Sequence, residues 1–93
     1  MFNDDLKAAV YGSADVMAEK HTALGNLRDG YHFLLANGIV MSIQQGTTGI
    51  HGNGDTAEVW AWDQNDKPVM GDPRGHCDAD QIAMIANFLN GAR

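Results

Sequence analysis

The first stretch of the chain, residues 3–24, has apolar residues at helical spacing on one stripe. The polar start at Asn3–Asp5 can cap a helix N-terminus and interacts favourably with the positive end of the helix dipole. Gly12 allows a bend, and Gly25 is a plausible helix stop. The pattern therefore predicts one helix over residues 3–24. Its stripe consists of Leu6, Val10, Ala14, Met17 and Leu24.

Residues 31–36 and 39–45 have the composition of two strands joined by Asn37-Gly38. This dipeptide favours a type I′ turn, which would set Leu34 opposite Met41 and Phe33 opposite Ser42. One face of the hairpin is then almost wholly apolar, and the other is mixed. A small open sheet needs only one apolar face. We therefore expect the mixed face to be covered by a loop, a second copy or a partner. Its apolar members are Tyr31, Phe33, Leu35 and Val40.

A third strand is predicted over residues 56–62, because small apolar residues alternate there with Glu58, Trp60 and Trp62. Residues 68–70 form a short fourth strand in this interpretation, and its proline suggests a sheet edge. Residues 71–75 are expected to be a loop.

A second helix is predicted over residues 79–90, with Asp78 as its cap, Gln81 completing a capping box and Gly91 ending it. The order is then helix, three or four antiparallel strands, helix. It predicts a single α+β domain over residues 1–93, a two-layer sandwich with both helices on one face of the sheet.

Charge limits the classes of partner. The chain has 93 residues, with 12 acidic against 6 basic side chains and a net charge of -6. This balance argues against direct binding of nucleic acid and against a polybasic membrane anchor. It leaves open a basic partner or simple solubility. Cys77 is the only cysteine, and the chain has neither a long apolar run nor a basic signal-peptide start. These features predict a cytoplasmic protein.

Few residues suggest catalysis or a cofactor. The glycine-rich stretch 46–55 could cradle a phosphate, but it lacks the phosphate-loop and dinucleotide motifs, which favours a hairpin connection. His51, His76, Cys77 and Asp78 are possible metal ligands without the usual spacing of a zinc site. Cys77 precedes a predicted helix, a position that would lower a thiol pKa. No set of base, orienting group and oxyanion donors accompanies it, so we expect neither an enzyme nor a bound cofactor.

Four aromatic residues are more informative. Two tryptophans on one strand face do not easily both fit the core of so small a domain. With neighbouring acids they form a hot-spot pattern for a basic partner. A second, smaller core is the alternative explanation. The four residues are Tyr31, Phe33, Trp60 and Trp62.

The hairpin and the last helix also resemble small anti-CRISPR proteins of phages and mobile elements. The resemblance is to the acidic kind that blocks DNA binding by multi-subunit type I surveillance complexes. It implies a non-enzymatic protein whose carboxylates occupy a lysine-rich DNA channel, a role that would fall on Asp29, Asp78 and Asp80. The matching residues are Asp29-Gly30-Tyr31-His32-Phe33, Asn37, Val40, Ile43-Gln44, Gly46-Thr47-Thr48 and Asp78-Ala79-Asp80.

The sequence interpretation is thus a phage-type inhibitor of a bacterial defence system, acting in the host cytoplasm on a complex subunit with a basic surface. An oligomeric protein that sequesters a nucleotide immune signal is the first alternative, and a phage accessory or structural subunit is the second. The expected partner-binding residues are Asp29, Tyr31, Phe33, Trp60, Trp62, Asp78 and Asp80. The ligand-binding residues of the first alternative are Thr47, Thr48, His51 and Arg74.

Overall fold

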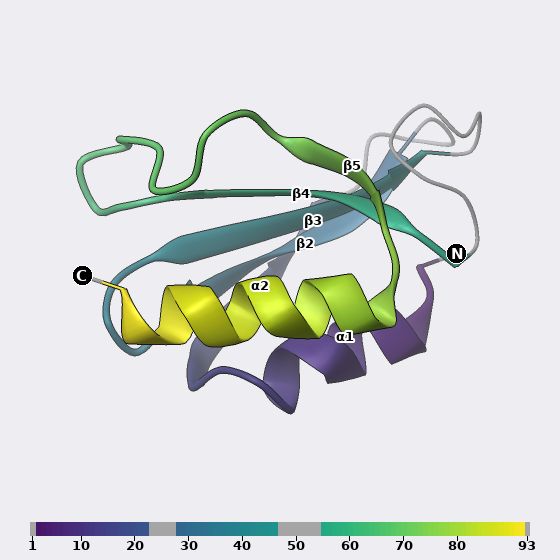
Figure 1. The fold of residues 1–93 in the computed structure, drawn as a ribbon, viewed down its shortest axis with the longest axis horizontal. Coiled ribbons are helices and arrows are strands. Elements are labelled where there is room, and N and C mark those ends of the chain that lie inside the picture. The colour runs from purple at the N-terminus through teal and green to yellow at the C-terminus, as the bar shows by residue number, and fades with distance from the viewer. Residues whose placement is uncertain (1, 23–27, 47–54, 93) are drawn as a thin grey trace.

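The computed structural model describes residues 2–22, 28–46 and 55–92. Its strands form one antiparallel sheet whose order follows the chain (Figure 1). The α+β class and the helix–strands–helix order agree with the prediction, but there are five strands rather than three or four. The elements are α1 (Asp4–Tyr11), β1 (Val16–His21), β2 (Arg28–Leu35), β3 (Val40–Gly46), β4 (Ala57–Trp62), β5 (Arg74–Cys77) and α2 (Ala79–Gly91).

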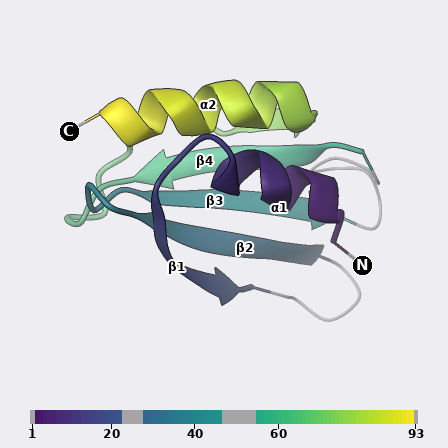
Figure 2. The ribbon, with the colours of Figure 1, turned by 90° about the horizontal axis from the view of Figure 1, so that it is seen from below.

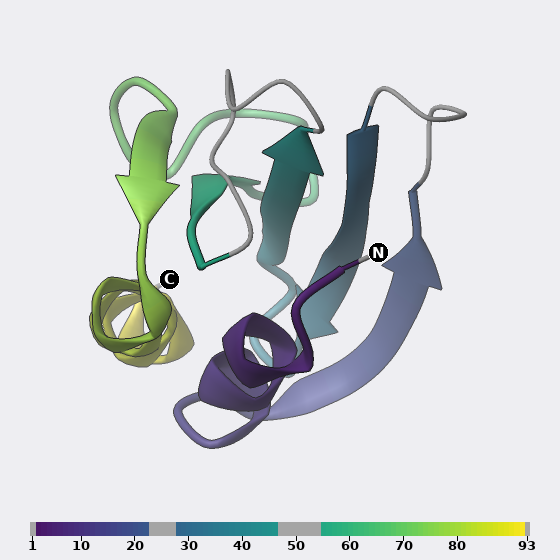
Figure 3. The same ribbon diagram turned by 90° about the vertical axis from the view of Figure 1, so that its right-hand side faces the viewer.

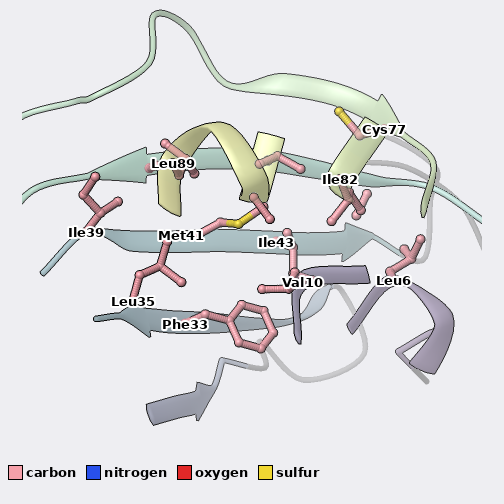
Figure 4. Close-up of a cluster of buried hydrophobic side chains, with 14 of the residues drawn as sticks. Leu6, Val10, Phe33, Leu35, Ile39, Met41, Ile43, Cys77, Ile82 and Leu89 are labelled. Carbon is pink, nitrogen blue, oxygen red and sulfur yellow. The ribbon is translucent and has the colours of Figure 1, made fainter. Parts of the chain in front are cut away.

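The two helices lie side by side on the same side of the sheet (Figure 2), and they contact each other. Seen from its end, the sheet curves around them (Figure 3). The core fills the space between helices and sheet, and its side chains point inward from both (Figure 4). Its largest fully buried members are Leu6, Val10, Phe33, Leu35, Met41, Ile43, Val59, Cys77, Ile82 and Leu89.

The first helix is much shorter than the sequence pattern predicts. It ends at Tyr11, and residues 16–21 form β1, which pairs with β2 (Glu19 opposite Phe33). β1 is an edge strand with mostly exposed side chains, so no alternation marks it in the sequence. Met17 is 69% exposed and belongs to no core stripe. The prediction of a helix over residues 3–24 is therefore wrong beyond Tyr11, and Leu24 and Gly25 lie outside the described residues.

The register of the β2–β3 hairpin differs by one residue from the prediction. Leu34 lies opposite Val40, and Phe33 lies opposite Met41. The connection has three residues, 36–38, and the Leu35 N–H donates to the Ile39 carbonyl (2.8 Å). Gly38 alone among them has a positive φ, 89°. The turn is thus not the type I′ turn, which needs two such residues.

The shift exchanges the two faces of β2, because strand side chains alternate between faces. Tyr31 and Phe33 point toward the helices, whereas His32 and Leu34 point away from them. The turn itself is tied to α2. The Asn37 side-chain amide donates to the carbonyls of Leu89 (2.8 Å) and Ala92 (2.6 Å). The Leu89 carbonyl also accepts from the Ala92 N–H (3.1 Å), so the Asn37 amide adds a further donor to the C-terminal end of α2.

The C-terminal half agrees better with the prediction. The apolar residues of β4 are buried and its tryptophans face the other way. The capping box at Asp78 is confirmed: its carboxylate accepts from the Gln81 N–H (2.9 Å), and Gln81 Oε1 accepts from the Asp78 N–H (3.0 Å). The strand predicted over residues 68–70 is only an isolated bridge between Trp62 and Pro68. The additional strand, β5, begins inside the segment predicted to be a loop.

Candidate functional site

The side chains that point away from the helices form a second surface of the sheet. Cross-strand pairing aligns them in rows. One row runs from Lys20 through His32 and Ser42 to Trp60. We call this surface the open face. It consists of Ala18, Lys20, Arg28, His32, Leu34, Val40, Ser42, Gln44, Glu58, Trp60 and Trp62.

Three aromatic rings occupy the middle of the open face. The Trp60 and Trp62 rings meet edge to face, with centroids 5.9 Å apart, and the His32 ring packs on Trp62 at 5.0 Å. Trp60 Nε1 donates to the Gly71 carbonyl (2.9 Å), which fixes the orientation of the indole. Both tryptophans are only partly buried. The prediction that they share one strand face is confirmed.

The open face is hollowed around these rings. One hollow of about 300 Å³ is mainly apolar and includes Leu34, Val40 and Trp62. A smaller one of about 240 Å³ is lined by Trp60, Trp62 and Asp66. The third, of about 250 Å³, is more polar, and we call it the Arg28–Trp60 pocket. Its lining residues are Thr22, Arg28, His32, Ser42, Gln44, Glu58, Trp60 and Pro73.

The floor of the Arg28–Trp60 pocket is a hydrogen-bonded side-chain network. Gln44 Nε2 donates to Thr22 Oγ1 (2.8 Å) and to Ser42 Oγ (3.2 Å). Gln44 Oε1 is buried and accepts no hydrogen bond in the described part of the chain. Gly30 lies opposite Gln44 on the neighbouring strand. A buried acceptor of this kind costs free energy unless a water or a ligand supplies a donor.

The charge of the open face differs from that of the whole chain. Lys20 and Arg28 bring positive charges, and neither has an ion pair in the ranges that the structure describes. Burial lowers the pKa of His32, and the charges of Lys20 and Arg28 lower it further. The imidazole is therefore neutral at neutral pH. Around its partly buried tryptophans, this acidic protein thus places two cations and a neutral histidine together with the carboxylates of Glu58 and Asp66.

The other two predicted aromatic contacts lie on the opposite side of the sheet. Phe33 is fully buried in the core. Tyr31 stacks on Phe33 with a centroid separation of 5.8 Å, and the Lys7 ammonium lies 4.3 Å from the centre of the Tyr31 ring. The predicted set of four aromatic residues is therefore divided between two faces. Phe33 cannot contact a partner in this structure, and the one-residue register shift is the reason.

The three predicted acidic residues do not lie on the open face. The Asp29 carboxylate makes a hydrogen-bond contact with the His21 ring on the neighbouring strand. Asp78 is the N-cap of α2, and Asp80 lies in the first turn of that helix. Asp78 thus has a structural role that accounts for its position. These three acids do not surround Trp60 and Trp62. Glu58 and Asp66 instead line hollows together with the two rings.

The residues predicted for nucleotide binding are only partly visible. Thr47, Thr48 and His51, with most of the glycine-rich stretch, lie outside the described residues. Arg74 lies on β5 and lines a separate hollow of about 480 Å³ with Met84 and Phe88 of α2.

The position of Cys77 before α2 does not lower the pKa of its thiol. It is fully buried, and burial raises its pKa more than the Arg74 charge lowers it. Its Sγ donates a weak hydrogen bond to the Arg74 carbonyl (3.6 Å). The neighbouring His76 is exposed. No three histidine, cysteine, aspartate or glutamate side chains come together as metal ligands within residues 2–22, 28–46 and 55–92.

Sequence reasoning missed the polar half of the open face. Arg28, His32, Ser42 and Gln44 became one cluster only when the strand register was known. One signal was present: Ser42 and Gln44 alternate with buried Met41 and Ile43, a spacing of two that marks an outward polar row.

Comparison with known proteins does not assign a family. No protein-family model, curated protein or solved structure matches the chain. Among the helices that the structure describes, none has the length and apolar character needed to cross a membrane.

Proposed function

We propose that this chain is a non-enzymatic binding protein whose open face contacts a partner protein. In this proposal the fold is a two-layer sandwich, with the helices as one layer and the sheet as the other. The observation that carries the proposal is the pair Trp60 and Trp62, held on a rigid strand with part of each ring accessible. Tryptophan is enriched among the residues that dominate binding energy at protein interfaces.

The surroundings of the two tryptophans support a protein partner. Leu34 is 41% exposed beside them, and Val40 lies next to it on β3. Hollows on either side of Trp62 can receive side chains of a partner. An apolar centre with charged residues at its margin is the usual composition of a protein interface.

The resemblance to anti-CRISPR proteins supplies the candidate partner, a subunit of a bacterial defence complex. The acid excess of the chain favours a basic partner. The position of the acids modifies the mechanism. Contact through Trp60 and Trp62 would block the complex sterically, and Asp80 would contribute only long-range attraction.

The absence of catalysis is also part of the proposal. It is supported by the state of Cys77, since a protonated, buried thiol is a poor nucleophile. Within the described residues, His21 and Asp29 form the one histidine–carboxylate pair, and it lies near the exposed edge of the sheet. Neither group adjoins the hollows of the open face.

The test is capture of defence-complex subunits from bacteria that express this chain with a purification tag. The Trp60→Ala/Trp62→Ala double variant should lose capture and protection of phage. Phe88→Ala is the matched control, because Phe88 is an exposed aromatic residue on α2. Circular dichroism must show that both variants are folded. Undiminished capture by the folded double variant contradicts the proposal.

A second pair of variants tests the acidic residues. Asp78→Ser removes the charge but keeps a capping oxygen, and Asp80→Asn removes a charge from the same turn. If the open face is the interface, these variants weaken capture slightly and in a salt-dependent way. A complete loss of capture by folded Asp78→Ser/Asp80→Asn would move the interface to the start of α2.

A further inference from the structure

The Arg28–Trp60 pocket has features of a small-ligand site that the proposed partner contact does not require. We infer that it binds a planar aromatic ring that bears a hydrogen-bond donor and an anionic group, either a carboxylate or a phosphate. The inference rests on the arrangement of Arg28, Gln44 and Trp60 around one hollow.

The Arg28–Trp60 pocket is small and is built mainly by three neighbouring strands. The hollow of about 250 Å³ suits a ligand with one or two rings. β3 supplies its floor with Ser42 and Gln44, while Arg28 and His32 come from β2 on one side and Trp60 from β4 on the other. All three strands are regular and hydrogen-bonded, so the walls and floor that they supply are formed before a ligand arrives. Such preorganisation reduces the entropy cost of binding.

Gln44 is the reason to expect a hydrogen-bond donor on the ligand. Its side chain is 7% exposed, and its Nε2 is held by Thr22 and Ser42. Its Oε1 has no hydrogen-bond partner in the described chain. Once the buried amide turns toward the hollow, a ligand N–H or O–H would satisfy an acceptor that is otherwise a cost to the fold. This acceptor distinguishes the pocket from the apolar hollow beside Leu34.

Arg28 is the reason to expect an anionic group on the ligand. Its guanidinium lines the pocket and has no ion pair in the ranges that the structure describes. A guanidinium can bind a carboxylate or a phosphate through two parallel hydrogen bonds. Lys20 lies one strand away, directly opposite His32. Together, Arg28 and Lys20 outnumber the one carboxylate of the described lining, that of Glu58, so the balance of charge still favours an anion.

Trp60 is the reason to expect an aromatic ring on the ligand. Its Nε1–H is already used by the Gly71 carbonyl, so the indole offers a ligand its ring surface rather than a hydrogen bond. Aromatic rings stack on such a surface in offset or edge-to-face geometry. His32, kept neutral by burial and by its cationic neighbours, adds a further polar ring on the opposite wall.

The experiment is an NMR titration of the purified, ¹⁵N-labelled protein with two probes. Adenosine monophosphate joins a ring, a donor and a phosphate, and indole-3-acetate joins a ring, a donor and a carboxylate. Adenosine and inorganic phosphate are the half-ligand controls. At least one probe should shift the signals of the Trp60 indole N–H and the Gln44 side-chain amide. It should bind at least about tenfold more tightly than either control.

Arg28→Gln is the decisive variant, and Arg74→Gln is its matched control on a different hollow. Arg28→Gln should weaken binding of the successful probe roughly ten- to hundredfold, the range for a lost charged hydrogen bond. Arg74→Gln should leave the affinity unchanged, and the spectra themselves report folding.

Two results would overturn the inference: no shift with either probe at about 1 mM, or equal affinity of wild type and folded Arg28→Gln. The probe that binds identifies the anion. The titration needs no partner protein, so its outcome is independent of the capture experiment.

Discussion

The side chain of Gln44 occupies the space above Gly30, its cross-strand neighbour. A Cβ atom built on Gly30 would lie 2.5 Å from Gln44 Oε1 and 2.3 Å from the Ile43 carbonyl oxygen. Both distances are far below van der Waals contact. The absence of a side chain at position 30 is therefore what allows the Gln44 amide to lie flat on the sheet and to reach Thr22 and Ser42.

Replacing Gly30 with alanine should destabilise the fold by about 1–3 kcal/mol, the usual cost of forcing an extra group into a packed site. The clash with the Ile43 backbone cannot be relieved by moving a side chain alone. Urea denaturation followed by circular dichroism measures the free energy of unfolding. Gly75→Ala is the control, because a Cβ there meets no atom within 4 Å. Equal stability of the two variants would show that the strands move apart without cost.

Asn37→Ala should also lower stability, by about 1–2 kcal/mol, because it removes hydrogen bonds to carbonyls at the end of α2. The β2–β3 turn and the helix would then be held together by packing alone. Asn87→Ala, an exposed substitution on α2, is the control and should change stability by a few tenths of a kcal/mol. Hydrogen exchange at the last turn of α2 should become faster only in Asn37→Ala. Unchanged exchange there would contradict the assigned role of Asn37.

His32 should make stability depend on pH. Its pKa is lowered in the folded protein, so the unfolded chain takes up a proton first as the pH falls through about 6.5. This contribution to stability is complete above that pH. It is lost progressively as the pH falls toward the lower pKa of the folded state.

The measurement is the free energy of unfolding across this pH window. In His32→Phe, which keeps a ring against Trp62, stability should fall less on acidification than in the wild type. His76→Asn, at an exposed position on β5, should follow the wild-type curve. A His32→Phe curve parallel to that of the wild type would be evidence against the effect.

Sequence patterns predicted the elements that local signals determine. The capping box of Asp78 and Gln81 located α2, and strict alternation located β4. The sequence pattern did not predict β1, because an edge strand buries few side chains and shows no alternation. Residues 16–21 form a strand through their pairing with β2. The hairpin register also depended on more than the turn dipeptide. Asn37 does not adopt the conformation that a type I′ turn requires, and its side chain instead binds α2.

The candidate site was predictable only in its aromatic part. Trp60 and Trp62 share a face whatever the register of their neighbours, because they are two residues apart on one strand. The positions of Tyr31 and Phe33 depended on the register and were therefore reversed. Arg28 and Gln44 come together through the pairing of β2 with β3, which no local pattern contains.

The order of the sheet has a kinetic consequence. Each strand pairs with its neighbour along the chain, so these pairings can form by closing loops between consecutive strands. The contact between α1 and α2 is different, since it joins the two ends of the sequence. Because closing so long a loop costs conformational entropy, we expect this contact to form late in folding. Substitutions between the helices should therefore accelerate unfolding more than they slow folding. The contact between α1 and α2 would then set the unfolding rate, and with it the lifetime of the native state.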